Sequence, residues 1–128
     1  MKHVLVVDDD LLICDVTRQL LQIPGLQCHS ARNYEQAVRV IEKCCPDLIL
    51  LDLHLPGMSG VEISRRIREL PTGSQPQIVA FTGDAVRDVT EFASEHGFDD
   101  IICKPFRVAD FNNLIQRCLE RQSAKVDQ

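Results

Sequence analysis

The stretch from Leu48 to Gly60 reads L-I-L-L-D-L-H-L-P-G-M-S-G and carries the clearest structural pattern in the chain. Its first four residues are aliphatic, which is typical of a strand buried on both faces. Residues 56–57, Pro-Gly, fit the central positions of a type II turn. Ser59, with Glu62 three residues later, forms a capping box that predicts a helix start. Asp52 therefore lies where a buried strand ends, the edge at which open α/β sheets bind ligands.

The rest of the chain alternates between short apolar runs and amphipathic helical patterns. The apolar runs predict strands at residues 3–7, 26–30, 48–51, 77–81 and 100–103. Helical patterns lie between residues 10 and 24, 33 and 46, 59 and 71, 84 and 97, and from 108 to 119. Gly97 fits the C′ position of the fourth helix. Five such units predict a parallel sheet covered by helices on both faces.

The first and last helices are predicted in more detail. Asp9 or Asp10 is expected to cap the first helix, and Asn33, with Gln36 three residues later, resembles a capping box that opens the second. The polar segment 121–128 is expected to fray, either as a tail after a domain of residues 1–120 or as the start of a linker. The inward faces are predicted from helical spacing, with Leu12, Ile13, Val16, Leu20 and Leu21 in the first helix and Phe111, Leu114, Ile115 and Cys118 in the last.

Composition narrows the class of protein. A length of 128 residues suits one domain, and 45% hydrophobic with 26% charged residues argues against disorder. The net charge of −5 argues against a nucleic-acid surface, and we interpret Arg65, Arg66 and Arg68 as a solvated helix face. No apolar stretch approaches the roughly 18 residues of a membrane span. The N-terminus, with four apolar residues before three aspartates, does not resemble a signal peptide.

The six cysteines are interpreted as reduced, small hydrophobic residues of a cytosolic protein, because there is no secretory signal and most of them lie in apolar patterns. Zinc binding is disfavoured, since the sequence has no C-x-x-C pair and no cluster of Cys and His. Cys44 and Cys45 are adjacent, a spacing poorly suited to one tetrahedral site.

Polar residues follow four of the five predicted strands. Asp8 and Asp9 follow the first, Asp52 the third, Thr82 the fourth and Lys104 the fifth. Each has a structural alternative: the aspartates can cap a helix, Thr82 can begin one, and Lys104 can be a surface lysine. A purely structural sheet has little reason to place polar residues at four strand ends, so the set favours a functional site.

The motifs V-L-V-V-D-D, L-I-L-L-D-L-H-L-P-G-M-S-G, A-F-T-G-D and I-C-K-P-F occur in this order along the chain. Together they resemble the motifs of the receiver domain of two-component response regulators, over about residues 3–120. The resemblance implies a flavodoxin-like (βα)5 fold with a five-stranded parallel sheet in the order 2-1-3-4-5.

The implied strand order makes the first and third strands neighbours, about 4.8 Å apart, so Asp8, Asp9 and Asp52 converge. Unit charges about 4 Å apart repel by roughly 4 kcal/mol at an effective dielectric constant near 20, so these carboxylates call for a cation. Oxygen ligands suit Mg²⁺. The resemblance implies that Mg²⁺ is bound by one or both of Asp8 and Asp9, by Asp52, and by the backbone carbonyl of His54.

The resemblance also implies the roles of the other polar residues. Asp52 is the nucleophile that accepts a phosphoryl group as an aspartyl phosphate. Thr82 reaches a phosphoryl oxygen, and Lys104, about 10 Å away by strand spacing, neutralises the phosphoryl charge. The Lys104–Pro105 bond is cis in the family. Many members carry an aromatic residue at the position of Ile101, so the aliphatic residue argues against an aromatic rotamer switch.

The function implied by the resemblance is a phosphorylation-operated, cytoplasmic switch that catalyses only its own phosphorylation and dephosphorylation. Its donor is a histidine kinase or a histidine phosphotransfer protein, and its target is an output domain or an effector protein, without nucleic-acid or membrane contact by this domain. Two alternatives stay open: a pseudo-receiver that is never phosphorylated, and an aspartate-nucleophile phosphohydrolase. The second is disfavoured because His54 occupies the place of its second aspartate. A flavin-binding protein is disfavoured by the acidic D-D-D-L-L loop.

Overall fold

The computed structural model describes residues 2–71, 75–83, 89–103 and 106–126 of the chain. Within them, strands and helices alternate, and the strands pair in parallel in the order β2-β1-β3-β4-β5. This confirms the predicted flavodoxin-like (βα)5 fold. The strands are β1 (Lys2–Val7), β2 (Leu26–Ala31), β3 (Leu48–Asp52), β4 (Gln77–Thr82) and β5 (Asp100–Cys103), and the helices are α1 (Leu11–Leu20), α2 (Tyr34–Cys44), α3 (Gly60–Glu69), α4 (Val89–His96) and α5 (Val108–Val126).

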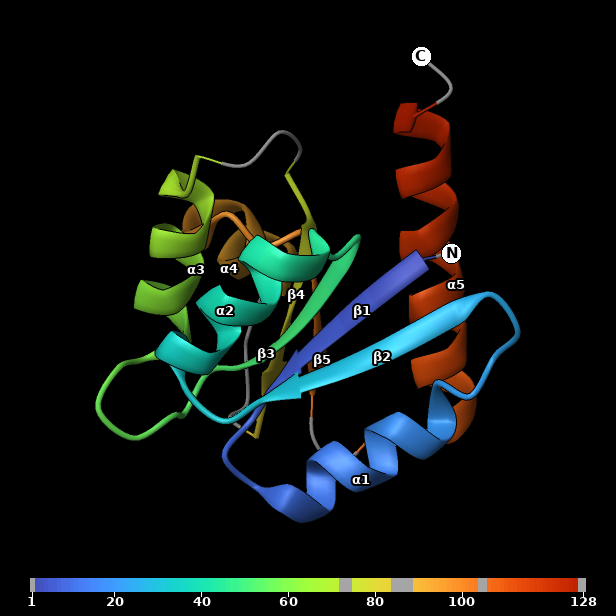
Figure 1. Cartoon of the computed structure of the whole chain (residues 1–128), viewed down its shortest axis with the longest axis horizontal. Coiled ribbons are helices and arrows are strands. Elements are labelled where there is room, and N and C mark those ends of the chain that lie inside the picture. The colour runs from blue at the N-terminus through green and yellow to red at the C-terminus, as the bar shows by residue number, and fades with distance from the viewer. Residues whose placement is uncertain (1, 72–74, 84–88, 104–105, 127–128) are drawn as a thin grey trace.

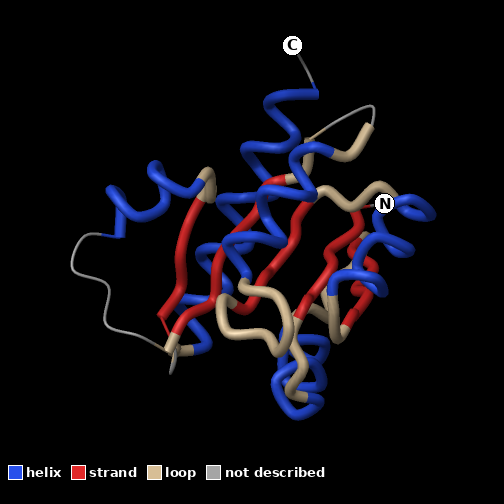
Figure 2. The backbone as a smooth tube through the Cα atoms, turned by 90° about the vertical axis from the view of Figure 1, so that its left-hand side faces the viewer, coloured by secondary structure: helices blue, strands red, loops and turns tan. Residues whose placement is uncertain are grey.

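The molecule has three layers, with the sheet in the middle (Figures 1 and 2). Helices α2, α3 and α4 cover one face, and α1 and α5 cover the other. Side chains alternate between the faces along each strand. In β3, for example, Ile49 and Leu51 pack under α2 and α3, whereas Leu48 and Leu50 pack under α1 and α5. All five residues of β3 are buried, which confirms that its aliphatic run is a central strand.

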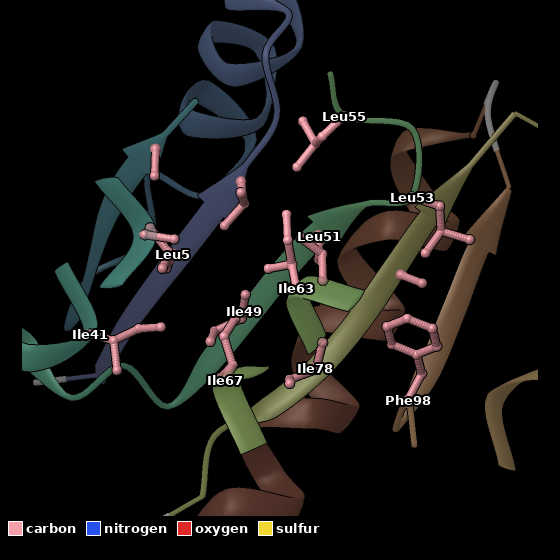
Figure 3. Packing of buried hydrophobic residues seen from close by; sticks show 14 of the residues in the cluster. Leu5, Ile41, Ile49, Leu51, Leu53, Leu55, Ile63, Ile67, Ile78 and Phe98 are labelled. Atoms are coloured by element: carbon pink, nitrogen blue, oxygen red, sulfur yellow. The ribbon is translucent and has the colours of Figure 1, made fainter. Parts of the chain in front are cut away.

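The core beneath α2 and α3 is built almost entirely from aliphatic side chains (Figure 3). Ile63 and Ile67 of α3 point toward Ile49 of β3 and Ile78 of β4. Isoleucine is β-branched, which suits the strand positions of Ile49 and Ile78. In α3, the four-residue spacing places Ile63 and Ile67 on one face of the helix. The packed core fixes the height of α3 above the end of β3, where Asp52 lies.

Three helices begin at the N-cap residues that the sequence indicates. Asp10 accepts a hydrogen bond from the Leu12 N–H at 2.9 Å, and Asn33 accepts one from the Gln36 N–H at 2.9 Å. Ser59 accepts one from the Glu62 N–H at 3.2 Å. The capping box at Ser59 is only half formed, because the Glu62 carboxylate binds arginines of its own helix.

The predicted inward face of α1 was wrong at two positions. Leu12 and Val16 are 68% and 40% exposed, whereas Cys14 and Thr17 are buried. The Cys14 thiol donates to the Asp8 carbonyl at 3.4 Å, which turns the Cys14 face toward the sheet. Helical spacing is compatible with burial of either of two adjacent faces of α1. The prediction chose the more hydrophobic face, which carries leucine and valine.

Helix α5 is longer than predicted. It continues to Val126, beyond the predicted end at residue 119, and the fraying of residues 121–128 stays a prediction. Residues 121–126 contain no glycine or proline, and arginine, glutamine, alanine and lysine are good helix formers. The last turns extend beyond the strands in Figure 1.

Two glycines have the left-handed backbone that the sequence predicts. Gly57 has φ +84° in the turn after β3, and Gly97 has φ +76° after α4. The Phe98 N–H donates to the Ala93 carbonyl at 2.8 Å, which closes the C-terminus of α4. Gly57 lies beyond the carboxyl end of β3, whereas Gly97 lies before β5, at the amino edge of the sheet.

The basic cluster of α3 is only partly the solvated face that we expected. Arg65 and Arg66 form exposed ion pairs with Glu62, as expected. Arg68 is different: it is 30% exposed and pairs with Asp99 at 3.0 Å. It also donates to the carbonyls of Pro76 and Gly97, at 2.8 and 3.1 Å. Arg68 therefore joins α3 to the segments before β4 and β5.

None of the helices in the described ranges has the length and apolar character that a bilayer span requires.

Candidate functional site

Strands β1, β3 and β4 end at one level, which gathers their next residues at a single edge of the sheet. Val7 of β1 pairs with Leu51 of β3, so Asp8 and Asp52 are the next residues on adjacent strands. Asp52 in turn pairs with Phe81, the residue before Thr82. The carboxyl ends of these three strands therefore present two aspartates and a threonine side by side.

Three carboxylates meet at this edge, as expected from the sequence. One oxygen from each of Asp8, Asp9 and Asp52 can be chosen so that all three atoms lie within 4.8 Å of one another. Asp8 and Asp52 are buried, with 1% and 7% of their surface exposed, and Asp9 is half-buried. We call these three residues the acidic cluster.

The three aspartates after β1 have two different roles, so they are more than a helix cap. The Asp8 N–H donates to the Ala31 carbonyl at 3.0 Å, so Asp8 still belongs to the sheet edge. Its carboxylate accepts from the Asp10 N–H at 3.0 Å. Asp10 caps α1 and is exposed, while Asp8 and Asp9 belong to the acidic cluster.

The loop after Asp52 is held tightly against it. The Asp52 Oδ1 accepts from the His54 N–H at 3.0 Å, and the Leu53 N–H donates to the Phe81 carbonyl at 3.0 Å. Gly60, at the start of α3, donates to the Leu53 carbonyl at 3.0 Å. A Cβ at Gly60 would lie 2.5 Å from the Asp52 carbonyl oxygen and 2.6 Å from the Leu53 Cα. Only glycine lets α3 approach the backbone that carries Asp52.

Gly60 is a residue that the sequence argument missed. Its φ is not in the left-handed region, so turn chemistry gives no indication of its importance. The requirement comes from the approach of two segments, which single-sequence patterns do not record.

The other predicted site residues are placed as follows. Thr82 is buried at the end of β4, beside the strand that carries Asp52. His54 has an exposed side chain in the loop after Asp52. Ile101, at the position of the family's aromatic residue, is buried in β5. Lys104 and Pro105 lie outside the described residues.

The electrostatics of the acidic cluster favour a divalent cation. Two carboxylate charges at 4.8 Å repel by about 3.5 kcal/mol at an effective dielectric constant near 20. Three clustered carboxylate oxygens, two of them on buried residues, match the ligand preference of Mg²⁺. The residues present therefore fit a hard cation such as Mg²⁺.

A second group of metal-ligating side chains was not predicted. His3, His29 and Cys44 can each offer one ligand atom, and these three atoms lie within 4.8 Å of one another. The expectation that the chain contains no cluster of Cys and His was therefore wrong. The sequence separates these residues by 26 and 15 positions, so only the folded sheet and helix bring them together.

The comparison with known families agrees with this geometry. Residues 4–116 match the response regulator receiver domain family. The chain belongs to the response regulator receiver domain family, which serves two-component signalling systems.

Individual relatives show the range of proteins that contain such a domain. The chain is 36% identical over 120 residues to the phosphate regulon transcriptional regulatory protein PhoB of Pseudomonas aeruginosa, covering 94% of this chain and 52% of PhoB. It is 34% identical to an uncharacterized 14.6 kDa protein of Leptolyngbya boryana, covering 91% of this chain and 89% of that protein. It is 31% identical to the aerobic respiration control sensor protein ArcB of Escherichia coli, covering 94% of this chain and 15% of ArcB. The chain thus spans about half of PhoB and a small part of ArcB.

Solved structures share the fold over nearly the whole chain. A CheY-like receiver domain protein from Methanospirillum hungatei superposes with a TM-score of 0.84 at 30% identity, covering 98% of both chains. The chemotaxis protein CheY4 of Vibrio cholerae superposes with a TM-score of 0.82 at 24% identity, covering 92% of this chain and 98% of CheY4. The second likeness concerns the fold alone.

Proposed function

We propose that this receiver domain is a phosphorylation-operated switch in which Asp52 accepts a phosphoryl group from a phosphohistidine. The donor is a histidine kinase or a histidine phosphotransfer protein. The observation that carries the proposal is the acidic cluster of Asp8, Asp9 and Asp52 at the carboxyl edge of the sheet. Membership of the receiver family and the position of Asp52 at the end of the central strand support the same role.

Asp52 acts as the nucleophile in this proposal. A carboxylate oxygen forms a bond to phosphorus as the phosphorus–nitrogen bond of the donor breaks, and the donor imidazole keeps the electron pair and takes up a proton. The His54 N–H, at 3.0 Å from Oδ1, holds the carboxylate in one orientation. The close approach of Gly60 prevents the backbone at Asp52 from shifting away.

Asp8, Asp9, Asp52 and the backbone carbonyl of His54 would hold Mg²⁺ at this edge. When bound, Mg²⁺ offsets the carboxylate charges and the charge that develops on the phosphoryl oxygens. Thr82, buried on the neighbouring strand, contacts a phosphoryl oxygen through its hydroxyl. The family resemblance assigns the remaining charge neutralisation to Lys104.

The switch acts on a partner through the face formed by α4, β5 and α5. Phosphorylation shifts Thr82 and the neighbouring loops, which biases this face toward one conformation. With aliphatic Ile101 in β5, the change proceeds without an aromatic rotamer. The partner is an output domain or an effector protein in the cytoplasm. The similarity to a transcriptional regulatory protein, of which this chain covers 52%, supports an output domain as the partner.

Phosphorylation by acetyl phosphate tests this proposal. The reduced full chain is incubated with acetyl phosphate, with and without Mg²⁺, and its intact mass is recorded beside Asp52→Asn. Asp10→Asn is the matched control, because Asp10 neighbours the cluster but caps α1, and asparagine is an equally good cap. We expect one phosphoryl group on the wild type and on Asp10→Asn with Mg²⁺, and none on Asp52→Asn.

Other outcomes identify the alternatives. Mg²⁺ binding without any adduct, or neither binding nor adduct, would contradict the proposal and favour a pseudo-receiver. Turnover of a generic phosphate ester would instead favour a phosphohydrolase. Circular dichroism of each variant establishes that a missing adduct does not result from unfolding.

A further inference from the structure

A second cluster of ligand atoms lies on the face of the sheet that α2 covers. His3 belongs to β1, His29 to β2 and Cys44 is the last residue of α2. A hydrogen bond of 3.0 Å joins the His3 Nδ1 and His29 Nε2 atoms, and the two rings stack with their centroids 5.3 Å apart. We call these three residues the His-Cys cluster.

The strand register explains why the two histidines meet. His3 pairs with Gln27, and Leu5 pairs with His29, so His3 and His29 are diagonal neighbours on the same face of two parallel strands. Cys44 ends α2, which packs over this face. The chain leaves the helix at Cys45, which has φ +48° and whose N–H donates to the Ile41 carbonyl. The three ligands thus come from three separate elements of regular structure.

The backbone around the His-Cys cluster is firmly held. The His3 N–H donates to the Asp47 carboxylate at 2.8 Å, and the Asp47 N–H donates to the His3 carbonyl at 2.8 Å. This pair joins the start of β1 to the segment that follows Cys44. Ligands on rigid, joined elements lose little conformational freedom when a metal binds.

The donor set is suited to a thiophilic divalent metal rather than to Mg²⁺. Zn²⁺ is bound by imidazole nitrogen at about 2.0–2.1 Å and by thiolate sulfur at about 2.3 Å, so its ligand atoms stand roughly 3.3–3.6 Å apart in a tetrahedron. The three ligand atoms already lie within 4.8 Å of one another, and a bound ion would replace the hydrogen bond between the two imidazoles. All three residues are half-buried, which leaves the site open to an ion and a water ligand.

Two charged groups bear on metal binding. Burial lowers the pKa of His29, and the neighbouring His3 and Lys43 lower it further, which favours the neutral imidazole that binds metals. Lys43 repels a cation at the same place, whereas the thiolate of Cys44 attracts one. A thiolate and two neutral imidazoles leave a bound Zn²⁺ with a net local charge of about +1.

We propose that His3, His29 and Cys44 form a binding site for Zn²⁺, with water as the fourth ligand, separate from the acidic cluster at the opposite end of β1. Occupancy joins α2 to β1 and β2, releases the Cys44 thiol proton, and stabilises the folded domain.

Cobalt absorption tests the proposal, because Co²⁺ adopts the tetrahedral geometry of Zn²⁺ and a bound thiolate gives a charge-transfer band that carboxylates cannot give. The reduced, metal-free full chain is titrated with Co²⁺ and then with Zn²⁺. We expect a thiolate band in the wild type that Zn²⁺ abolishes. Cys44→Ser removes the band, and Cys45→Ser, which changes the exposed neighbouring cysteine, retains it.

A second measurement keeps the test independent of the folding of one variant. Zn²⁺ raises the midpoint of thermal unfolding of the wild type and of Asp8→Asn, and this increase is lost in His29→Gln and in Cys44→Ser. The proposal is overturned if the wild type gives no thiolate band, or if the band survives in Cys44→Ser. It is also overturned if Asp8→Asn, rather than His29→Gln, removes the stabilisation by Zn²⁺, because the ion then binds at the acidic cluster.

Discussion

The two ends of β1 gather side chains of opposite chemical character. At its carboxyl end, Asp8 joins Asp9 and Asp52, three anionic oxygen donors. Near its amino end, His3 joins His29 and Cys44, which are donors of nitrogen and sulfur. The carboxylates of the first group repel one another, whereas the second group does not bring three anionic groups together. One strand therefore supports a hard site and a soft site at its two ends.

The aspartates of the two sheet edges differ in the same way. At the amino edge, the Asp47 carboxylate accepts from the His3 N–H, and the Asp99 carboxylate accepts from the Ile78 N–H and from Arg68. At the carboxyl edge, the carboxylates of the acidic cluster crowd one another. The same residue type therefore stabilises one edge of the sheet and prepares the other for ligand binding.

Gly60→Ala is expected to reduce stability more than any of the other substitutions, and it disrupts only the carboxyl edge of the sheet. The new Cβ would lie 2.5 Å from the Asp52 carbonyl oxygen, and backbone atoms cannot yield as a flexible side chain can. We expect the free energy of unfolding to fall by about 3 kcal/mol, measured by urea denaturation.

Gly83→Ala is the matched control, since a Cβ at Gly83 meets nothing within 4 Å. It should change stability by less than about 0.5 kcal/mol. A loss below about 1 kcal/mol in Gly60→Ala would show that α3 can move away from Asp52.

Asp8→Asn should stabilise the Mg²⁺-free protein and weaken its Mg²⁺ binding. Asparagine keeps the oxygen that accepts from the Asp10 N–H but removes one of three crowded charges. We expect a gain of about 2 kcal/mol in urea denaturation. Isothermal titration calorimetry should show Mg²⁺ affinity reduced roughly tenfold or more. Asp10→Asn should change neither quantity, and a destabilised Asp8→Asn would contradict the repulsion that we assign to the acidic cluster.

Arg68→Ala is expected to weaken the opposite edge of the sheet. It removes the ion pair with Asp99 and the hydrogen bonds to Pro76 and Gly97. Because the pair is partly exposed, we expect a loss of about 1 kcal/mol with Mg²⁺ affinity unchanged. Arg66→Ala, which removes an exposed pair within α3, should cost less than about 0.5 kcal/mol. Equal losses in the two variants would refute the structural role of Arg68.

The smallest expected effect is the acid sensitivity of the His-Cys cluster. Burial lowers the pKa of His29 below its ordinary 6.5, with His3 and Lys43 contributing. The folded state disfavours protonated His29, so this contribution to stability is present above pH 6.5 and is lost as the pH falls through the lowered pKa. The midpoint of thermal unfolding should fall slightly as the pH decreases from 6.5 through the lowered pKa of His29. His29→Gln should reduce this fall. An unchanged pH dependence in His29→Gln would remove His29 as its cause.

Much of the fold was predictable because local chemistry and tertiary structure agree. The aliphatic run before Asp52 is a fully buried strand, and Asn33 and Ser59 cap the helices that their spacing predicts. The buried face of α1 was not predictable from spacing, because Leu12 and Val16 form an apolar face next to the one that is buried. Helical periodicity gives the width of a face but not which of two adjacent faces packs.

The two clusters differ in predictability for a physical reason. Asp8 and Asp9 are adjacent in the sequence, and the strand order alone brings Asp52 beside them. The His-Cys cluster depends on the diagonal register of β1 and β2 and on the end point of α2. The sequence pattern of one chain reveals neither the register of these strands nor the end of α2, and it does not reveal the close approach at Gly60.

The position of the phosphoryl group tests the central claim most directly. After incubation with acetyl phosphate and Mg²⁺, the chain is treated with borohydride, which reduces an aspartyl phosphate to homoserine, and the conversion is located by tandem mass spectrometry. Our account predicts homoserine at position 52 alone, and none when Mg²⁺ is omitted. Conversion at Asp8 or Asp9, or equal conversion without Mg²⁺, would contradict it.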